Sequence, residues 1–253
     1  MLIAVAGATG RLGEHLVEVL EERGHGVVPI SRTHGIDLTT AVGLERALTG
    51  VEAILDAATT PNPDEAEATA FFRAASRNLH EAGRAAGVRR MLVVSIVGLE
   101  AFANGYSRAK LAHEDAALAG PIPTRILRAT QFHEFVGQLL DWGTQGEVGH
   151  VPDMLTQLVA ARSVAEAMAN LVTAPTWSAQ DGPALEIAGP RPEKLFDAAT
   201  LLAAKRGRPA KVEIGSNPAD PDFEANASGA LLPGPGAILA GPTFASWLET
   251  AEV

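Results

Sequence analysis

Residues 2–13 read LIAVAGATGRLG, and this stretch decides the fold. Its first five residues are apolar and predict a buried strand, and apolar residues recur at helical spacing from Leu12 onward. Between the two, Gly7 permits a sharp turn, Gly10 lets backbone approach an anion, and Gly13 lets the helix pack closely on the strand. The first N–H groups of a helix are unpaired and are available to the pyrophosphate anion. We therefore predict a dinucleotide-binding turn; a tight turn without a ligand is the alternative.

Short β-branched runs alternate with longer segments of helical spacing over the first half of the chain. This alternation is typical of βαβ units and predicts an α/β fold with a doubly wound parallel sheet. Strands are expected at residues 2–6, 26–31, 53–57, 90–95, 124–128 and 184–188. Helices are expected at residues 11–23, 66–86, 107–118, 163–172, 194–205 and 243–250.

The pattern changes beyond about residue 140, where glycine and proline become denser and strands become rarer. Residues 142–154 and 231–242 are predicted to be irregular loops. No internal repeat and no linker-like composition interrupts the chain. We therefore expect one domain over residues 1–253, in which residues 140–253 contribute most of a small C-terminal lobe on the substrate side.

Composition limits the classes of protein that the chain can represent. Hydrophobic residues make up 47% and charged residues 20%, which excludes a disordered chain and provides a large core. The formal charge of −10 and the pI of about 5.2 argue against nucleic acid or an anionic membrane as a partner. No cysteine is present and the seven histidines are scattered, so the sequence predicts no disulfide, thiolate nucleophile or metal site.

Targeting signals are not evident in the sequence. The N-terminal residues lack the basic region that opens a secretory signal, and no apolar stretch approaches the roughly 20 residues of a membrane span. The lack of cysteine fits a reducing compartment. We expect a soluble cytoplasmic protein that binds a small-molecule substrate, and the sequence leaves the oligomeric state open.

Four further motifs accompany the glycine-rich turn. They are SR at residues 31–32, MLVVSIVG at 91–98, YSRAK at 106–110 and LRATQF at 127–132. Together with the GxxGxxG spacing of the turn, they make nearly the whole chain resemble the atypical short-chain dehydrogenase/reductase superfamily, specifically its NmrA-like branch. The resemblance implies a Rossmann-like sheet of about seven strands with an NAD(P) cofactor at its C-terminal edge.

The tip of the second strand bears on the choice of cofactor. An NAD site usually places an acidic side chain there to bind the ribose, whereas a 2′-phosphate needs cations and hydroxyls. Here Ser31 and Arg32 occupy the tip, no acid follows directly, and Arg11 lies in the nearby turn. We therefore favour NADP(H) over NAD(H); solvated surface arginines are the alternative.

The remaining cofactor-binding candidates lie in the turn or near strand ends. They are Thr9, Arg11, Leu12, Asp37, Leu38, Ala57, Ala58, Thr59 and Phe132. The resemblance puts an adenine contact at Asp37 and Leu38, although Asp37 is equally placed to cap a turn. Residues 57–59 are small and let backbone approach the nicotinamide-side ribose, unless they form only a plain strand end. Phe132 is expected to border the nicotinamide.

Tyr106 is the only tyrosine, and Lys110, one of four lysines, follows it by four residues. This spacing puts both side chains on one face of a helix, where an ammonium lowers the pKa of a phenol and makes it a general acid/base. Lys110 is also expected to bind the ribose hydroxyls of the cofactor. The resemblance implies a Ser/Tyr/Lys set completed by Ser95, which ends the strand at 90–95; a strand-end hydroxyl bonded to backbone is the alternative.

Aromatic, histidine and methionine residues in the second half are further candidates for the substrate pocket. His133 is placed to donate a proton to substrate, but a helix-start histidine bonded to its neighbours is the preferred interpretation. Trp142, His150, Met154 and Trp177 are placed either to line an apolar pocket or to pack in the core or on the surface.

Three functions fit these residues. The leading hypothesis is an NADP(H)-dependent reductase that transfers hydride to a small carbonyl or quinone-type substrate. The second is a non-catalytic NADP(H)-binding redox sensor of the NmrA type, against which the retained Tyr106 argues because such regulators usually lack it. The third is an enzyme that uses tightly held cofactor for an internally balanced reaction, such as epimerisation or dehydration.

Overall fold

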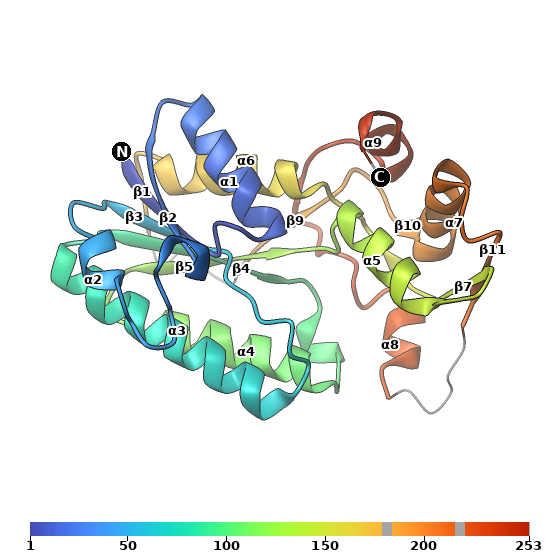
Figure 1. Cartoon of the computed structure of the whole chain (residues 1–253), viewed down its shortest axis with the longest axis horizontal. Coiled ribbons are helices and arrows are strands. Elements are labelled where there is room, and N and C mark those ends of the chain that lie inside the picture. The colour runs from blue at the N-terminus through green and yellow to red at the C-terminus, as the bar shows by residue number, and fades with distance from the viewer. Residues whose placement is uncertain (179–183, 216–220, 253) are drawn as a thin grey trace. The chain divides into compact units, whose positions relative to one another are not determined.

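A seven-stranded sheet forms the centre of the computed structural model, which describes residues 1–178, 184–215 and 221–252. Its strand order is β12-β9-β5-β4-β3-β1-β2 (Figure 1). The strands are β1 (Leu2–Ala6), β2 (Gly26–Ile30), β3 (Ala53–Asp56), β4 (Arg90–Ile96), β5 (Thr124–Ala129), β9 (Leu185–Ala188) and β12 (Ile238–Leu239). The pairs β1–β2, β1–β3, β3–β4 and β9–β12 are parallel. The predicted Rossmann-like α/β fold is therefore confirmed.

The strand order reverses at β1, which pairs with β2 on one side and with β3 on the other. Open α/β sheets bind ligands at the carboxyl ends of the strands next to such a reversal. In this chain those ends carry the turn at Gly7 and the segment at residues 57–59. The topology therefore brings two of the sequence motifs to one edge of the sheet.

Residue contacts divide the chain into two compact units. The first comprises residues 1–95, 105–128 and 164–185, and the second comprises residues 96–104, 129–163 and 186–253. Helix α6 (Ala161–Thr173) therefore lies mainly in the first unit, although its residues fall within the expected C-terminal lobe. The expected single-domain organisation stays a prediction.

Helices cover both faces of the sheet in the first unit. Figure 1 shows α1 (Arg11–Glu22) and α6 on one face, with α2 (Leu44–Ala47), α3 (Glu65–Ala86) and α4 (Gly105–Leu118) on the other. Helix α1 buries Leu12, Leu16, Val19 and Leu20, which recur at helical spacing, and this apolar stripe holds it on the sheet. Arg23 hydrogen-bonds Asn170, linking the end of α1 to α6 at 2.9 Å.

Helix α3 begins and ends at signals that are local in the sequence. Asp64 caps its N-terminus by accepting a hydrogen bond from the Glu67 N–H at 3.0 Å, and Gly87 ends it in the left-handed conformation. Helix α3 packs against α4 (Figure 1). This packing places Phe72 of α3 beside Tyr106 of α4, with ring centroids 6.2 Å apart.

The second unit has its own core and two small sheets. Its helices are α5 (His133–Gly143), α7 (Leu195–Arg206), α8 (Phe223–Ala227) and α9 (Phe244–Thr250). Its short strands are β6 (Thr144–Gln145), β7 (Val148–Val151), β8 (Leu155–Thr156), β10 (Glu193–Lys194) and β11 (Lys211–Ile214). The fully buried side chains Leu140, Leu158 and Phe244 belong to one apolar cluster that joins these elements.

The predicted loop at residues 142–154 is wrong. Its centre forms the antiparallel hairpin β6–β7, and β11 adds to β7 in parallel. Glycines caused the error, because Gly146 makes the turn with a φ of 62° while Gly149 packs inside the sheet. A Cβ at Gly149 would lie 2.6 Å from a terminal methyl group of Leu140, so a side chain at this position would have to displace that leucine. The predicted loop at 231–242 likewise contains strand β12.

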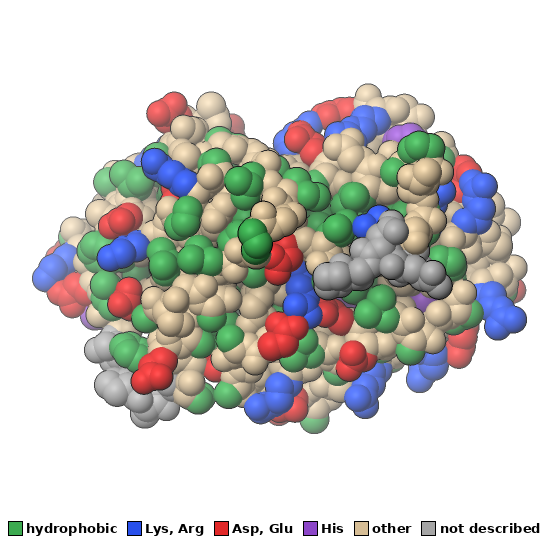
Figure 2. All heavy atoms as spheres, turned by 180° about the vertical axis from the view of Figure 1, so that it is seen from behind, with side chains coloured by type: hydrophobic (Ala, Val, Ile, Leu, Met, Phe, Trp, Pro, Cys, Tyr) green, Lys and Arg blue, Asp and Glu red, His purple; other side chains and the backbone are tan. Residues whose placement is uncertain are grey.

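Acidic and basic side chains alternate over the surface rather than forming one charged area on the face drawn in Figure 2. That mixture agrees with the modest excess of acidic residues in the sequence. Among the described residues, no helix is both long and apolar enough to span a membrane. In the same residues no group of three or more His, Asp or Glu side chains is arranged to hold a metal ion.

Candidate active site

The glycine-rich turn between β1 and α1 is built by close backbone packing. Gly7 has a φ of 77°, and a Cβ there would lie 2.7 Å from the Ala57 carbonyl oxygen at the end of β3. A Cβ at Gly13 would lie 2.0 Å from the Gly7 carbonyl oxygen. Two of the three glycines therefore leave no room for a side chain, as expected when a helix start packs directly on a strand end.

The start of α1 fits a phosphate group. Gly10 is the N-cap residue, and no side chain caps the helix. A Cβ at Gly10 would meet only the Gly7 carbonyl oxygen, at 3.2 Å, so the space in front of this residue is otherwise open. Thr9 and Arg11 are exposed beside it, whereas the Leu12 side chain is buried. An open, uncapped helix start with a nearby cation is suited to the pyrophosphate of a dinucleotide.

Ser31 and Arg32 lie at the carboxyl end of β2, where a 3₁₀ turn runs over Arg32–His34. The Ser31 hydroxyl is 2.7 Å from Nδ1 of His34, and the Arg32 side chain is exposed. Residues 31–34 therefore present one guanidinium, two hydroxyls and one imidazole, with no carboxylate among them. Such a set suits a phosphate better than a ribose 2′-hydroxyl.

Asp37 and Leu38 have structural partners in this geometry. The Asp37 carboxylate accepts hydrogen bonds from the Thr39 hydroxyl at 2.6 Å and the Thr39 N–H at 2.7 Å. The hydrogen bonds from Thr39 hold the pKa of Asp37 below its usual range. The Leu38 side chain is buried in the core, and its carbonyl oxygen accepts from Nδ2 of Asn78 at 2.7 Å. Asp37 thus caps a turn here, and a role in adenine binding stays a proposal.

Tyr106 lies in the first turn of α4 and hydrogen-bonds Thr59, with the two hydroxyl oxygens 2.8 Å apart. Thr59 is exposed just beyond β3, so this contact brings the tyrosine to the edge that carries the glycine-rich turn. Burial raises the pKa of Tyr106, although the Thr59 hydrogen bond acts to lower it. The phenol is therefore protonated at neutral pH and suited to donate a proton.

Lys110 does not act on Tyr106 as the sequence spacing predicted. Its Nζ donates to the Val94 carbonyl oxygen at 3.1 Å and lies 3.0 Å from Nδ1 of His113. The side chain is only 4% exposed. Burial lowers the pKa of Lys110 to about 8, although the carboxylates of Asp56 and Glu114 act to raise it. The expected lowering of the tyrosine pKa is therefore wrong for this geometry, because the ammonium is held by other partners.

Ser95 lies in β4 and is 3% exposed. Its Oγ has no hydrogen-bond partner among the described residues, so the structure joins it neither to Tyr106 nor to backbone. A buried hydroxyl without a partner is unfavourable by itself and retains hydrogen-bonding capacity. The Ser/Tyr/Lys set thus has three members in the first unit, but no hydrogen bond between Ser95 and the other two.

Sequence reasoning missed a buried network behind Tyr106. Nε2 of His113 lies 3.2 Å from Oδ2 of Asp56, and both side chains are almost fully buried. Arg128 forms two hydrogen bonds to the Glu114 carboxylate, at 2.9 and 2.7 Å. A carboxylate at the end of the apolar strand segment AILD was the one available signal, because Asp56 is a charged residue where a buried strand is expected.

The second unit holds Phe132 and His133. Phe132 is the N-cap residue of α5 and pairs with Val159 in an isolated bridge. His133 is fully buried, with Nε2 3.1 Å from the Leu158 carbonyl oxygen and the ring against Phe244 and Trp247. These contacts favour the preferred interpretation of a histidine bonded to its neighbours. Burial lowers the pKa of His133 to about 4.

The low pKa of His133 predicts acid sensitivity. An unfolded histidine titrates near 6.5, so the folded state keeps its full stability above pH 6.5 and loses it as pH falls toward 4. The loss is expected to reach about 3 kcal/mol by pH 4. In His133→Gln this part of the pH dependence should disappear, as urea unfolding at several pH values would reveal. The half-exposed His150 provides the control, since His150→Gln should retain the wild-type slope.

The four residues proposed to line an apolar pocket have different surroundings. Met154 packs in the core of the second unit, and Trp142 is 68% exposed there. His150 lies 4.0 Å from the Glu213 carboxylate. In the first unit, Trp177 packs against the guanidinium groups of Arg90 and Arg125, which lie 5.4 and 5.6 Å from the centre of its ring. Trp142 also packs edge-on against Phe135, with ring centroids 6.2 Å apart, so all four have contacts within the protein.

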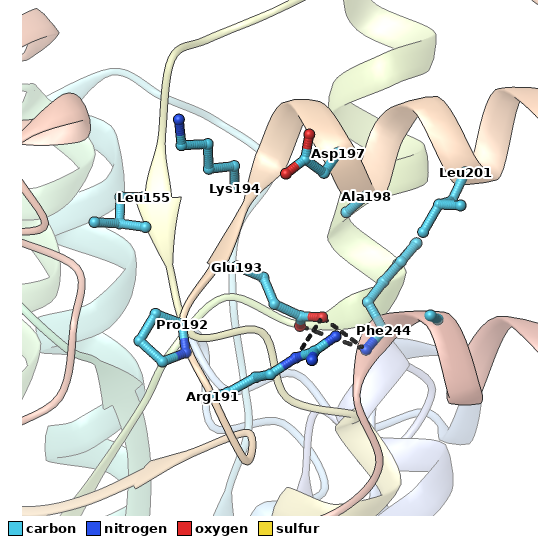
Figure 3. A pocket seen from close by; sticks show the side chains of 10 residues that line it. Leu155, Arg191, Pro192, Glu193, Lys194, Asp197, Ala198, Leu201 and Phe244 are labelled. Atoms are coloured by element: carbon cyan, nitrogen blue, oxygen red, sulfur yellow. Dashed lines mark hydrogen bonds and ion pairs between the residues drawn. The ribbon is translucent and has the colours of Figure 1, made fainter.

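A cavity of about 440 Å³ lies within the second unit (Figure 3). It is lined by Leu155, Arg191, Pro192, Glu193, Lys194, Asp197, Ala198, Leu201, Phe244 and Ala245. The Glu193 carboxylate faces Arg191 and accepts a hydrogen bond from the Phe244 N–H at 3.3 Å (Figure 3). Burial raises the pKa of Glu193. The Glu193 carboxylate therefore has a structural role, because it binds the start of α9. None of the residues that line the cavity is among the expected site residues.

Comparison with known proteins agrees with the geometry of the turn. The model of the NAD dependent epimerase/dehydratase family matches residues 3–120. The match covers less than half of the chain and includes the glycine-rich turn, Tyr106 and Lys110. Membership of the short-chain dehydrogenase/reductase superfamily and of its NmrA-like branch stays a prediction. A curated relative, ceramide reductase of Caulobacter vibrioides (strain NA1000 / CB15N), is 33% identical over 144 residues, which cover 50% of this chain and 45% of that protein. The match thus spans less than half of the relative.

Two solved structures share the fold over nearly the whole chain. A dTDP-4-dehydrorhamnose reductase from Bacillus anthracis str. Ames, in complex with NADP, has a TM-score of 0.74 and 16% identity, with 99% of each chain covered. MoeE5, in complex with UDP-glucuronic acid and NAD, has a TM-score of 0.73 and 20% identity, covering 99% of this chain and 97% of its own. At identities this low, the structural likeness establishes the common fold alone.

Proposed function

We propose that the protein is an NAD(P)H-dependent oxidoreductase that transfers hydride to a small carbonyl or quinone-type substrate. The observation that carries this proposal is the hydrogen bond between Tyr106 and Thr59. It places a protonated phenol just beyond the carboxyl end of β3, at the edge of the sheet that carries the glycine-rich turn. The match to an NAD-dependent family and the reductase activity named for two similar proteins support it.

Tyr106, Ser95 and Lys110 each have a role in the proposed reaction. When bound, the reduced nicotinamide supplies the hydride that adds to the substrate carbonyl carbon. Tyr106 donates its phenolic proton to the carbonyl oxygen as negative charge develops there, which completes the alcohol. Ser95, with an unpaired hydroxyl, is the proposed second donor to that oxygen, and Lys110 keeps positive charge behind the site. Solvent then returns a proton to Tyr106.

The cofactor is proposed to bind along the edge formed by the ends of β1, β2 and β3. The start of α1 would hold the pyrophosphate, with Gly10 allowing close approach and Thr9 and Arg11 beside it. Residues 57–59 would lie along the nicotinamide-side ribose. Ser31 and Arg32 would bind the 2′-phosphate of NADP(H), which is the basis for preferring it over NAD(H).

The cofactor preference predicts a selective effect of Arg32→Ala. A charge-assisted pair with phosphate contributes about 1.5–3 kcal/mol, so the Kd for NADPH should rise about 10- to 100-fold. The Kd for NADH should change less than about twofold, because NADH lacks the phosphate. Fluorescence titration with each nucleotide measures both values. Arg46→Ala, which removes another exposed arginine of the first unit, is the matched control, and an equal loss for both nucleotides would contradict the assignment.

The function itself is tested by titrating the protein with NADPH and NADH and then offering a panel of carbonyl compounds and quinones. Oxidation of NADPH with any member of the panel, in stoichiometric amount, is the expected result. Tight binding without turnover would instead favour the redox sensor. The third hypothesis, an internally balanced reaction, is favoured by the epimerase/dehydratase family model and predicts product formation without release of oxidised cofactor.

The setting of the reaction is proposed from composition. A chain with ten more acidic than basic residues is suited to a small-molecule substrate rather than to nucleic acid. The lack of cysteine is compatible with a reducing cytoplasm.

A further inference from the structure

Asp56 occupies an unusual position in the first unit. It is the last residue of β3 and is fully buried, and β3 is a central strand of the sheet. Burial acts to raise the pKa of Asp56, but the hydrogen bonds from His113 and the Ala58 N–H, together with the charge of Lys110, hold the pKa below its usual range. A buried carboxylate is therefore kept ionised, which requires specific partners for both of its oxygens.

One oxygen of Asp56 is bonded to the segment that holds Tyr106. Oδ1 accepts a hydrogen bond from the Ala58 N–H at 2.9 Å. The next residue is Thr59, whose hydroxyl lies 2.8 Å from the Tyr106 hydroxyl. The carboxylate therefore fixes the backbone from which Thr59 reaches the phenol.

The other oxygen of Asp56 leads to Lys110. Oδ2 lies 3.2 Å from Nε2 of His113, and Nδ1 of His113 lies 3.0 Å from Nζ of Lys110. An ammonium group only donates, so Nδ1 accepts and the ring proton resides on Nε2, which donates to Asp56. Burial and the nearby Lys110 charge lower the pKa of His113, which keeps the ring neutral.

Phe72 packs against both His113 and Lys110. Its ring stacks on the His113 ring with centroids 4.5 Å apart and an interplanar angle of 16°. Nζ of Lys110 lies 4.9 Å from the same ring centre. This stacking fixes the plane of the imidazole ring, in which both of its hydrogen bonds lie.

We propose that Asp56 is a positioning residue that couples Tyr106 to Lys110, one oxygen acting through Ala58 and Thr59 and the other through His113. The assignment of Tyr106 and Lys110 to the reacting site rests on the proposed function. The coupling itself is a property of the first unit and is measurable without cofactor or substrate.

Asp56→Asn tests the coupling because it keeps the size of the side chain and removes its charge. If the amide oxygen continues to bind the Ala58 N–H, the amide nitrogen faces Nε2 of His113 and requires that atom to accept. His113 then carries its proton on Nδ1, where it opposes the Lys110 ammonium. The pKa of Lys110 should fall by about one unit or more. The pKa of Tyr106 should rise, because a neutral amide oxygen accepts the Ala58 N–H hydrogen bond more weakly than a carboxylate does and therefore holds Thr59 less firmly.

The chain allows both shifts to be measured directly. Tyr106 is the only tyrosine, so tyrosinate absorbance reports on it alone. The four lysines give four resolvable signals when ¹³C-labelled, and Lys110→Arg identifies the one from Lys110. Two further variants separate the paths: Thr59→Val should shift Tyr106 alone, and His113→Gln should shift Lys110 alone. Asp64→Asn removes an exposed carboxylate of the same unit and should shift neither.

A shift of both groups in Asp56→Asn, with single shifts in the two path variants, supports the coupling. A shift of one group or none overturns it, as does an equal response in Asp64→Asn. If Asp56→Asn does not fold, ¹⁵N spectra of wild-type His113 decide the matter: a proton on Nε2 supports the proposal and a proton on Nδ1 overturns it. Coupling in a protein without any reductase activity would leave the positioning role standing and refute only the proposed function.

Discussion

Replacing Tyr106 by phenylalanine is expected to lower kcat by about 10²- to 10⁴-fold with a substrate identified in the panel. The change removes one oxygen atom, which is the proton donor of the proposed reaction. The ring should keep its place, because its edge-on packing against Phe72 does not involve the hydroxyl. Only the hydrogen bond to Thr59 is lost, and this should change the free energy of unfolding by about 1 kcal/mol.

Steady-state kinetics and nucleotide titration separate the chemical role of Tyr106 from a structural one. The Kd for NADPH should stay within about twofold of wild type, since the proposed nucleotide contacts lie in other segments. Thr59→Val is the matched control, because it removes the same hydrogen bond and keeps the phenol. Its kcat should fall by less than about tenfold. Wild-type turnover in Tyr106→Phe would eliminate the tyrosine as proton donor.

The parts of the fold that could be predicted are those with local signals. The turn at residues 7–13 is predicted by the spacing of its glycines. Helices α3 and α7 are each followed by a glycine in the left-handed conformation, and each ends within one residue of its predicted end. The hairpin at residues 144–151 could not be predicted in this way. Gly149 reads as a loop residue by itself, and its actual role depends on Leu140 and Pro209 packing against it.

The candidate site shows the same division between local and distant information. The sequence placed Tyr106 and Lys110 on one helix correctly, because their separation is a property of the helix. It did not reveal where the ammonium points. That direction is set by Val94, His113 and, through His113, by Asp56, which lies 57 residues earlier in the chain. Electrostatic surroundings depend on such distant contacts, so spacing alone gave the wrong pKa direction for Tyr106.

Gly13→Ala is expected to cause the largest loss of stability among single-atom additions to the turn. The new Cβ would lie 2.0 Å from the Gly7 carbonyl oxygen and 2.8 Å from the Ala8 Cα, both backbone atoms that cannot rotate away. Helix α1 must therefore shift outward from β1, which opens the packing of Leu12 and Leu16 against the sheet. Overpacking of this kind costs about 3 kcal/mol or more, which offsets the better helix propensity of alanine.

Thermal unfolding of Gly13→Ala should give a Tm roughly 10 °C below wild type, and NADPH binding should weaken at least tenfold because the shifted helix start no longer faces the proposed phosphate position. Gly236→Ala is the matched control: a Cβ there meets no atom within 4 Å and the φ angle is not in the left-handed range. Its Tm should stay within about 2 °C of wild type. If Gly13→Ala matched this control in both Tm and nucleotide affinity, the close approach of α1 to β1 would not be what shapes the turn. A loss of stability with unchanged affinity would instead separate the packing role of Gly13 from phosphate binding.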